Sequence, residues 1–217
     1  VTGVQTCALP IWLALDVPEE DGGLGFSNTD TAILSEVLGY YMPIIPIFSS
    51  GVVFKHILMN AKKEKKEELL PEIISGEKIG TFAVYESDKY EINQDTINTQ
   101  LTTLDSGFVL NGNKKYVMFG DVSDYIAVLA KHEDGYKFVL VSSDSDGVTV
   151  KETTSLDQTR PMCEVEMSNV ALDSNAVLIE LDSELSEWNK VKNIALGYLA
   201  MEQVGARSEE HTSELQS

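Results

Sequence analysis

The first part of the chain carries apolar residues at helical spacing. Over residues 29–41 they recur at steps of four and five, and Asn28 with its neighbours supplies side chains that cap a helix start. Two more amphipathic patterns follow a loop marked by prolines, over residues 52–59 and 63–76, the second with lysine and glutamate interleaved on its polar side. The spacing therefore predicts a helical segment over residues 12–77.

The pattern then changes. Short runs rich in β-branched and aromatic residues follow one another, and turn-forming pairs such as Asn111-Gly112 and Asp134-Gly135 separate them. A stretch of this kind predicts an antiparallel β-barrel or sandwich over residues 78–181.

A helical pattern returns after the β region. Apolar residues at three- and four-residue steps, among them Leu185, Trp188 and Val191, predict a helix over residues 182–206. The expected fold class is thus α+β: a helical N-terminal segment, an antiparallel β-barrel or sandwich as middle domain, and the start of a truncated C-terminal helical bundle.

Composition and charge narrow the function classes. Of the 217 residues, 43% are hydrophobic and 24% are charged, which is the balance of a globular protein. The formal charge of -19 would repel nucleic-acid phosphates and an anionic membrane surface alike. The most apolar stretch, residues 40–54, is interrupted by Pro43 and Pro46 and is too short for a membrane span. We therefore expect neither a nucleic-acid partner nor a membrane span.

Both ends of the chain read as translated sequencing-library DNA. Residues 207–217 match the in-frame translation of a common short-read sequencing adapter, and residues 1–11 match the translation of its reverse complement. We expect the natural segment to be residues 12–206. Cys7 then falls outside it and Cys163 remains alone, which excludes an intrachain disulfide and a cysteine-based metal site and favours a cytoplasmic location.

No catalytic constellation stands out from the residues themselves. His56 lies in a helical pattern and His132 beside a turn, and neither has a serine or cysteine arrangement that suggests a triad or a metal site. Cys163 alternates with apolar residues on one strand face, which favours a buried, unreactive thiol. We interpret all three as structural and expect no metal site.

The chain resembles the acyl-CoA dehydrogenase family in three segments, in this order and spacing: LDVPEEDGGLGFS, SGEKIGTFAVYE and GFVLNGNKKYVMFGDVSDYIAVLA. That family has an N-terminal helical domain, a middle β domain and a C-terminal four-helix domain. The resemblance implies a flavoprotein oxidoreductase of fatty acid metabolism that uses FAD to oxidise an acyl-CoA to its 2,3-enoyl-CoA. It also implies an electron-transfer flavoprotein as redox partner and assembly into a homo- or hetero-oligomer.

The resemblance also assigns residues to the cofactor. In the family the flavin ring lies along two strands of the middle domain, and the contacts this implies here are Phe82, Val84, Tyr85, Tyr116, Val117 and Met118. Alternation along a strand places Tyr116 and Met118 on one face and Val117 on the other, so Tyr116 can cover the ring. The other interpretation is that Tyr116 is an ordinary barrel aromatic.

Departures from the family pattern leave a second function open. Met118 and Tyr85 stand where the family usually has threonine or serine. The small-residue loop that approaches the cofactor pyrophosphate is replaced by bulky and acidic residues over 87–92. In some heteromeric pairs of the family one subunit keeps the fold without a complete flavin site. The chain is therefore part of an active flavin subunit, a flavin-poor and non-catalytic partner, or a plain β-domain binding module.

The catalytic base is expected outside this chain. The resemblance places the glutamate that removes the α proton in the missing part of the C-terminal domain, and the alternative family position corresponds to Ala195, which is no base. The chain by itself is therefore expected to be inactive. We interpret Glu202 as structural and expect Asp157 and Arg160 to form a surface ion pair.

Overall fold

The computed structural model describes residues 10–88, 92 and 96–214. Its N-terminal part is helical, and the elements in chain order are η1 (Glu19–Asp21), α2 (Asn28–Tyr41), the wide helical segment η2 (Ile47–Phe54), α3 (Lys55–Met59) and α4 (Lys63–Ser75). The first and last of the expected helices are present as α2 and α4. The middle one begins earlier than expected, because η2 continues directly into α3.

Helix α2 begins after Ser27, whose backbone N–H and hydroxyl both donate to the carboxylate of Asp30, at 2.9 and 2.6 Å. The cap is therefore Ser27, one position before the expected Asn28. The helix ends at Tyr41, and the next residue, Met42, adopts a left-handed backbone with φ of 41°. The loop that follows lines the same cavity as Met118 and Phe119 at the end of β3 (Gly107–Met118).

In the described part of the chain, eight strands follow the helices and form one sheet. They are β1 (Gly80–Ala83), β2 (Gln100–Leu104), β3 (Gly107–Met118), β4 (Tyr125–His132), β5 (Gly135–Ser142), β6 (Val148–Thr153), β7 (Met162–Leu172) and β8 (Val177–Leu181). The spatial order is β6-β7-β3-β2-β4-β5-β8, with β1 beside β4. Most neighbours are antiparallel, as expected, but β1 and β2 pair with β4 in parallel. Long connections allow these two parallel pairings. The sheet is not closed, because β6 and β8 form its two ends.

Strand β4 is buried on both faces. Ala127 and Leu129 belong to the core that the sheet shares with the helices, while Ile126 and Val128 belong to a second core on the other face. A strand buried on both sides is apolar without alternation, which explains the continuous run in its sequence.

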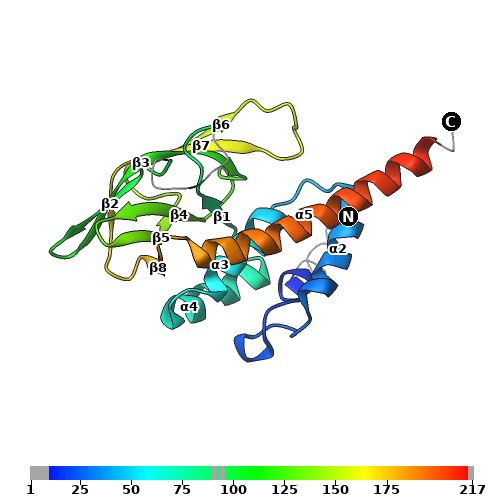
Figure 1. The fold of residues 1–217 in the computed structure, drawn as a ribbon, viewed down its shortest axis with the longest axis horizontal. Helices are drawn as coiled ribbons and strands as arrows, with labels where there is room; N and C mark the ends of the chain where they lie inside the picture. Colours follow the sequence, from blue (N-terminus) through cyan, green and yellow to red (C-terminus); the bar gives the residue numbers. More distant parts are fainter. Residues whose placement is uncertain (1–9, 89–91, 93–95, 215–217) are drawn as a thin grey trace.

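The long helix α5 (Ser186–Glu214) follows the sheet (Figure 1). Near its start Trp188 packs against Phe82 of β1 and Phe138 of β5, with ring centroids 6.1 and 5.7 Å apart. This aromatic cluster fixes the first turns of α5 to the sheet. The helix continues past residue 206 into the segment expected to be adapter-derived.

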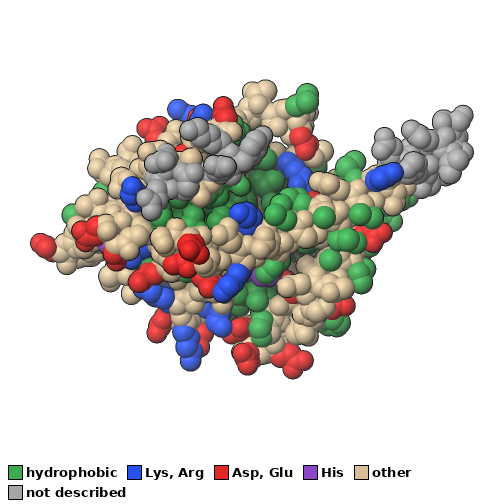
Figure 2. Space-filling model, viewed as in Figure 1, with side chains coloured by type: hydrophobic (Ala, Val, Ile, Leu, Met, Phe, Trp, Pro, Cys, Tyr) green, Lys and Arg blue, Asp and Glu red, His purple; other side chains and the backbone are tan. Residues whose placement is uncertain are grey.

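Further along, α5 packs against α2 at very close range. A Cβ at Gly39 would overlap the carbonyl oxygen of Glu202, and a Cβ at Gly205 would overlap the carbonyl oxygen of Glu36. The two helices therefore approach backbone to backbone. Figure 2 shows apolar side chains gathered over this part of the molecule, and Val37, Tyr41, Leu196 and Val204 are among the exposed ones.

Candidate functional site

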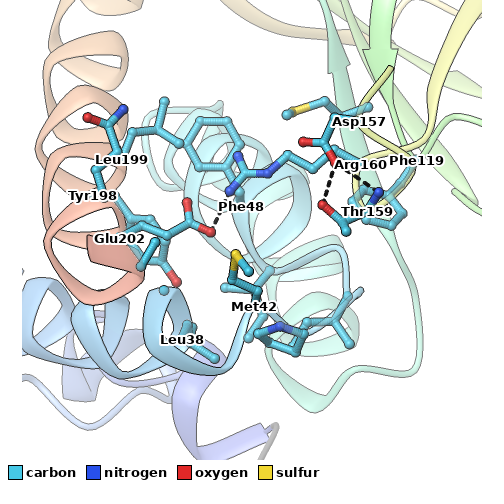
Figure 3. A pocket seen from close by; sticks show the side chains of 17 residues that line it. Leu38, Met42, Phe48, Phe119, Asp157, Thr159, Arg160, Tyr198, Leu199 and Glu202 are labelled. Atoms are coloured by element: carbon cyan, nitrogen blue, oxygen red, sulfur yellow. Dashed lines mark hydrogen bonds and ion pairs between the residues drawn. The ribbon is translucent and has the colours of Figure 1, made fainter. Parts of the chain in front are cut away.

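A cavity of about 310 Å³ lies where the helices meet the end of the sheet (Figure 3). Its walls come from α2 and the loop after it, η2, the end of β3, the loop before β7, and α5. An apolar wall with a few converging polar groups is the usual composition of a ligand pocket. The apolar part includes Leu38, Met42, Phe48, Met118, Phe119 and Leu199, and the polar part includes Asp157, Thr159, Arg160, Tyr198 and Glu202.

A β-bulge in β3 shapes one edge of this cavity. Lys114 pairs with Val165 of β7, and the next registered pair is Val117 with Cys163, so two residues of β3 face one residue of β7. Tyr116, inside the bulge, has a left-handed backbone with φ of 57°. The bulge returns Val117 to the core and leaves Tyr116 exposed.

The structure places the six expected cofactor contacts in two groups. Phe82, Val84 and Val117 are buried, and their side chains pack within the two cores of the molecule. Tyr116 is exposed, and Met118 is half-buried and lines the cavity. Tyr85 is also half-buried, and burial raises the pKa of its hydroxyl. The alternation expected for residues 116–118 agrees with this burial.

Glu86 and Lys114 form a buried ion pair that the sequence did not reveal. Lys114 Nζ lies 2.7 Å from Glu86 Oε1 and 3.2 Å from the carbonyl oxygen of Val84. The Glu86 carboxylate also accepts the backbone N–H groups of Asn98 and Thr99 at 2.6 and 3.0 Å. Burial alone would raise the pKa of Glu86, but the Lys114 ammonium and the backbone donors outweigh it and the pKa falls. Burial lowers the pKa of Lys114 to about 8 against the opposing effect of Glu86.

The acidic loop over residues 87–92 is described only at its ends. Its residues 89–91 lie outside the described part of the chain. At its start, the Tyr116 hydroxyl donates to the Asp88 carboxylate at 2.6 Å. A carboxylate thus lies against the residue expected to cover the flavin ring.

The prediction that Asp157 and Arg160 form an ion pair is wrong. Arg160 Nη2 instead pairs with Glu202 Oε1 of α5, across the cavity (Figure 3). Asp157 accepts the backbone N–H and the hydroxyl of Thr159 at 2.9 and 2.6 Å. This local turn satisfies the Asp157 carboxylate and leaves the Arg160 side chain free to reach α5. Tyr198, on the same helix, is buried, and burial raises the pKa of its hydroxyl.

The first histidine belongs to a buried ionic cluster at the start of the chain. Asp16 pairs with the Lys55 ammonium, which also donates to the carbonyl oxygen of Leu13 at 3.0 Å. His56 Nε2 lies 3.3 Å from the other Asp16 oxygen, and its Nδ1 lies 2.7 Å from the carbonyl oxygen of Val52. The cluster ties the first residues of the described chain to η2 and α3.

The second histidine and the cysteine lie in the β domain. His132 contacts Asp134 through Nδ1 and Thr103 Oγ1 through Nε2, the latter at 2.8 Å. Cys163 is fully buried, and burial raises the pKa of its thiol. Within residues 10–88, 92 and 96–214, no three His, Cys, Asp or Glu side chains are grouped to hold a metal ion. None of the helices in that part is long and apolar enough to cross a membrane.

The structure defines an α+β protein with a cavity between a helical layer and the end of a sheet. The family description "Acyl-CoA dehydrogenase, N-terminal domain" matches residues 11–77, and "Acyl-CoA dehydrogenase, middle domain" matches residues 81–170. The chain therefore belongs to the acyl-CoA dehydrogenase family. Its fold class and the resemblance seen in the sequence are confirmed.

Relatives of known name cover part of the chain. It is 34% identical over 124 residues to a bovine protein, "Very long-chain specific acyl-CoA dehydrogenase, mitochondrial" of Bos taurus, an alignment that takes 54% of this chain and 18% of that protein. It is 28% identical over 142 residues to "Isovaleryl-CoA dehydrogenase, mitochondrial" of Solanum tuberosum, over 63% of this chain and 32% of that protein. The chain thus aligns with less than a third of the length of the potato relative and with a smaller share of the bovine relative.

Solved structures share the fold. A structure titled as an FAD-dependent dehydrogenase superposes with a TM-score of 0.85 at 23% identity, over 99% of this chain and 62% of that chain. A glutaryl-CoA dehydrogenase from Mycobacterium smegmatis in complex with FADH2 gives a TM-score of 0.81 at 21% identity, over 93% and 53%. The ChsE4-ChsE5 complex from Mycobacterium tuberculosis gives a TM-score of 0.79 at 20% identity, over 94% of this chain and 54% of that chain.

Proposed function

We propose that this chain is part of a flavin-dependent acyl-CoA dehydrogenase that oxidises an acyl-CoA to its 2,3-enoyl-CoA. The observation that carries the proposal is the cavity between α2, α5 and the end of β3, which meets Met118 on the strand assigned to the flavin ring. Family membership supplies the reaction class, and the cavity supplies an apolar place for an acyl chain beside that strand.

The residues at the end of β3 fit a flat aromatic ring. Tyr116 presents an exposed ring from a bulge that holds its backbone in place, and Met118 beside it is half-buried at the cavity edge. Thr81 Oγ1 of β1 donates to the Met118 carbonyl oxygen at 2.6 Å, which fixes this edge to the neighbouring strand. Tyr116, Met118 and Tyr85 are therefore the side chains that would hold FAD. Phe82, Val84 and Val117 would support them from the core.

FAD, when bound, supplies the acceptor for the β hydride of the thioester. This chain would orient the acyl group in the cavity and exclude water from it. Ala195 is buried and carries no base, and Glu202 is engaged by Arg160. The base that takes the α proton is thus proposed to lie in a C-terminal domain outside this chain, so the isolated chain should be inactive.

Purification of the full-length protein tests the proposal. We expect it to carry a flavin with the visible absorbance of bound FAD, and we expect Tyr116→Ala to lose most of that absorbance because the ring loses its cover. Tyr41→Ala is the matched control, since Tyr41 is an exposed tyrosine of α2 that does not line the cavity. A protein without flavin, both alone and co-expressed with a neighbouring homologue, would contradict the proposal.

A second candidate is a flavin-poor partner subunit of a heteromeric dehydrogenase. The contact between Tyr116 and Asp88 favours it, because a carboxylate next to the ring site would repel the cofactor phosphates. In that case the full-length protein would carry flavin only in a mixed assembly. Asp88→Asn would then raise the flavin content of the protein purified alone, whereas Asp144→Asn, an exposed carboxylate on another loop, would not.

We also propose an electron-transfer flavoprotein as redox partner, a homo- or hetero-oligomer, and a cytoplasmic location. The exposed apolar side chains of α2 and α5 support assembly, because a contiguous apolar surface usually marks an interface. Sedimentation of the full-length protein tests the oligomer, reduction of added electron-transfer flavoprotein tests the partner, and cell fractionation tests the location.

A further inference from the structure

The charged groups of the cavity are few. Among the described residues that line it, Asp157, Arg160 and Glu202 are the charged ones, so its wall has two acidic groups and one basic group. The rest of the wall that an acyl chain would meet is mostly apolar, with Leu38, Phe48 and other aliphatic or aromatic side chains.

The one cation among the described lining residues is already paired. Arg160 reaches from the loop before β7 to Glu202 on α5, and both side chains are largely shielded, at 30% and 20% exposure. The nearby Asp157 carboxylate accepts the backbone N–H and the hydroxyl of Thr159 through one of its oxygens and adds a second negative charge to this side of the cavity. Figure 3 shows the Arg160–Glu202 pair as a bridge between the sheet side and the α5 side of the cavity.

We propose, on the basis of the proposed function, that the Arg160–Glu202 ion pair makes this cavity select acyl groups with an uncharged tail and reject acyl groups that end in a carboxylate. An uncharged tail meets the apolar wall and leaves the ion pair intact. A terminal carboxylate needs a cation in a site of lowered dielectric constant, and Glu202 holds that cation. It also meets the repulsion of Glu202 and Asp157.

Glu202 is thus the specificity-determining residue, and Arg160 is the latent carboxylate site. Removing the Glu202 charge while keeping its shape frees a guanidinium with several unused N–H donors. The same cavity would then accept the terminal carboxylate that it rejects in the native protein. Removing Arg160 instead gives no such gain, because no other cation among the described lining residues replaces it.

The test uses the full-length protein with its flavin and two ligands of equal chain length, octanoyl-CoA and octanedioyl-CoA, titrated by calorimetry. We expect the native protein to bind octanoyl-CoA at least about tenfold more tightly. Glu202→Gln should tighten octanedioyl-CoA by about tenfold and change octanoyl-CoA by less than about twofold. Arg160→Met should give no gain for octanedioyl-CoA. Glu187→Gln, at a half-buried residue of α5 that pairs with Lys190 outside the cavity, should change the binding of neither ligand.

The outcomes separate this inference from the proposed function. One outcome is that Glu202→Gln, shown by its melting temperature to be folded, binds octanoyl-CoA and keeps the native ratio of the affinities for the two ligands. This result overturns the role of the ion pair and leaves the dehydrogenase proposal standing. Equal binding of both ligands by the native protein also overturns it. Binding of neither ligand by any variant contradicts the proposed function, and the inference fails with it.

Discussion

Lys114 of β3 and Glu86 after β1 form an ion pair from which solvent is nearly excluded, with side-chain exposures of 0% and 7%. Through the same carboxylate Glu86 holds the backbone just before β2. The pair therefore fixes the two ends of the segment that contains the acidic loop, beside the strand proposed to carry the flavin ring.

Replacing Lys114 with methionine should lower the free energy of unfolding by about 3–5 kcal/mol, because it leaves the Glu86 charge buried without its partner. Urea denaturation of the purified chain, followed by circular dichroism, measures this change. The double variant Lys114→Met with Glu86→Gln should recover part of the loss, since no unpaired charge then remains.

Lys63→Met is the control for that series, because Lys63 forms an exposed pair with Glu67 on α4. Its effect should stay within about 0.5 kcal/mol. If the Lys63 and Lys114 substitutions lowered the free energy of unfolding by the same amount, burial of the Glu86–Lys114 pair would not contribute to stability.

The buried cluster around Asp16 should make the protein sensitive to acid. Burial by itself would raise the pKa of Asp16, but the hydrogen bond from His56 and the charge of Lys55 outweigh it and lower the pKa from 3.8 to about 2. Between these two values the unfolded chain binds the proton and the folded chain does not. The stability from Asp16 is therefore complete above pH of about 4 and is lost as the pH falls toward 2, a change of about 2 kcal/mol.

Unfolding free energies of the native chain and of Asp16→Asn, measured from pH 7 down to about pH 2, check this prediction. The difference in unfolding free energy between the two proteins should be constant above a pH of about 4 and should become smaller below that pH. Asp144→Asn, which removes an exposed carboxylate, should show no such narrowing. A gap that stays constant down to pH 2 would exclude Asp16 as the source.

The close contact of α2 and α5 should not tolerate a methyl group. Gly39→Ala should lower the free energy of unfolding by about 1–3 kcal/mol, because the new Cβ meets the backbone of α5 and the helices must separate. Gly197→Ala is a matched control on α5, since its added Cβ meets no described atom within 4 Å beyond the neighbouring backbone of its own helix. It should raise the stability by about 0.5–1 kcal/mol through helix propensity. Chemical denaturation of both variants gives the comparison, and a loss in both would point to a cause other than the contact.

The sequence predicted the layers of the fold because each depends on local pattern. The amphipathic stretch of α2, the continuous apolar run of β4 and the turn pairs between strands all reflect burial of neighbouring residues. The parallel pairings of β1 and β2 were missed, since strand partners far apart in the chain leave no periodic signal. The bulge at Tyr116 was missed for a related reason: it depends on the register between β3 and β7.

The site was predictable only in part. The assignment of Tyr116 and Met118 to the flavin comes from the family resemblance and stays a prediction. Phe82 and Val84 came from the same resemblance, yet their side chains are enclosed between the sheet and the helices, which no local pattern shows. Lys114 was not singled out, because lysine is normally a surface residue and its partner lies in another segment. The ion pair of Glu202 with Arg160 has no signal in the sequence, because Arg160 comes from a loop far away in the chain.

Helix α5 is attached near its start, where Trp188 packs on the aromatic rings of the sheet, and further along, where Gly205 meets the backbone of α2. Between these points Tyr198 packs on Phe48 of η2. Tyr198 and Glu202, which face the cavity, lie between these two attachments. The wall of the cavity therefore cannot swing outward as a hinged lid unless one attachment breaks. An acyl chain bound in this cavity would therefore be accommodated by rotation of lining side chains rather than by movement of the helix.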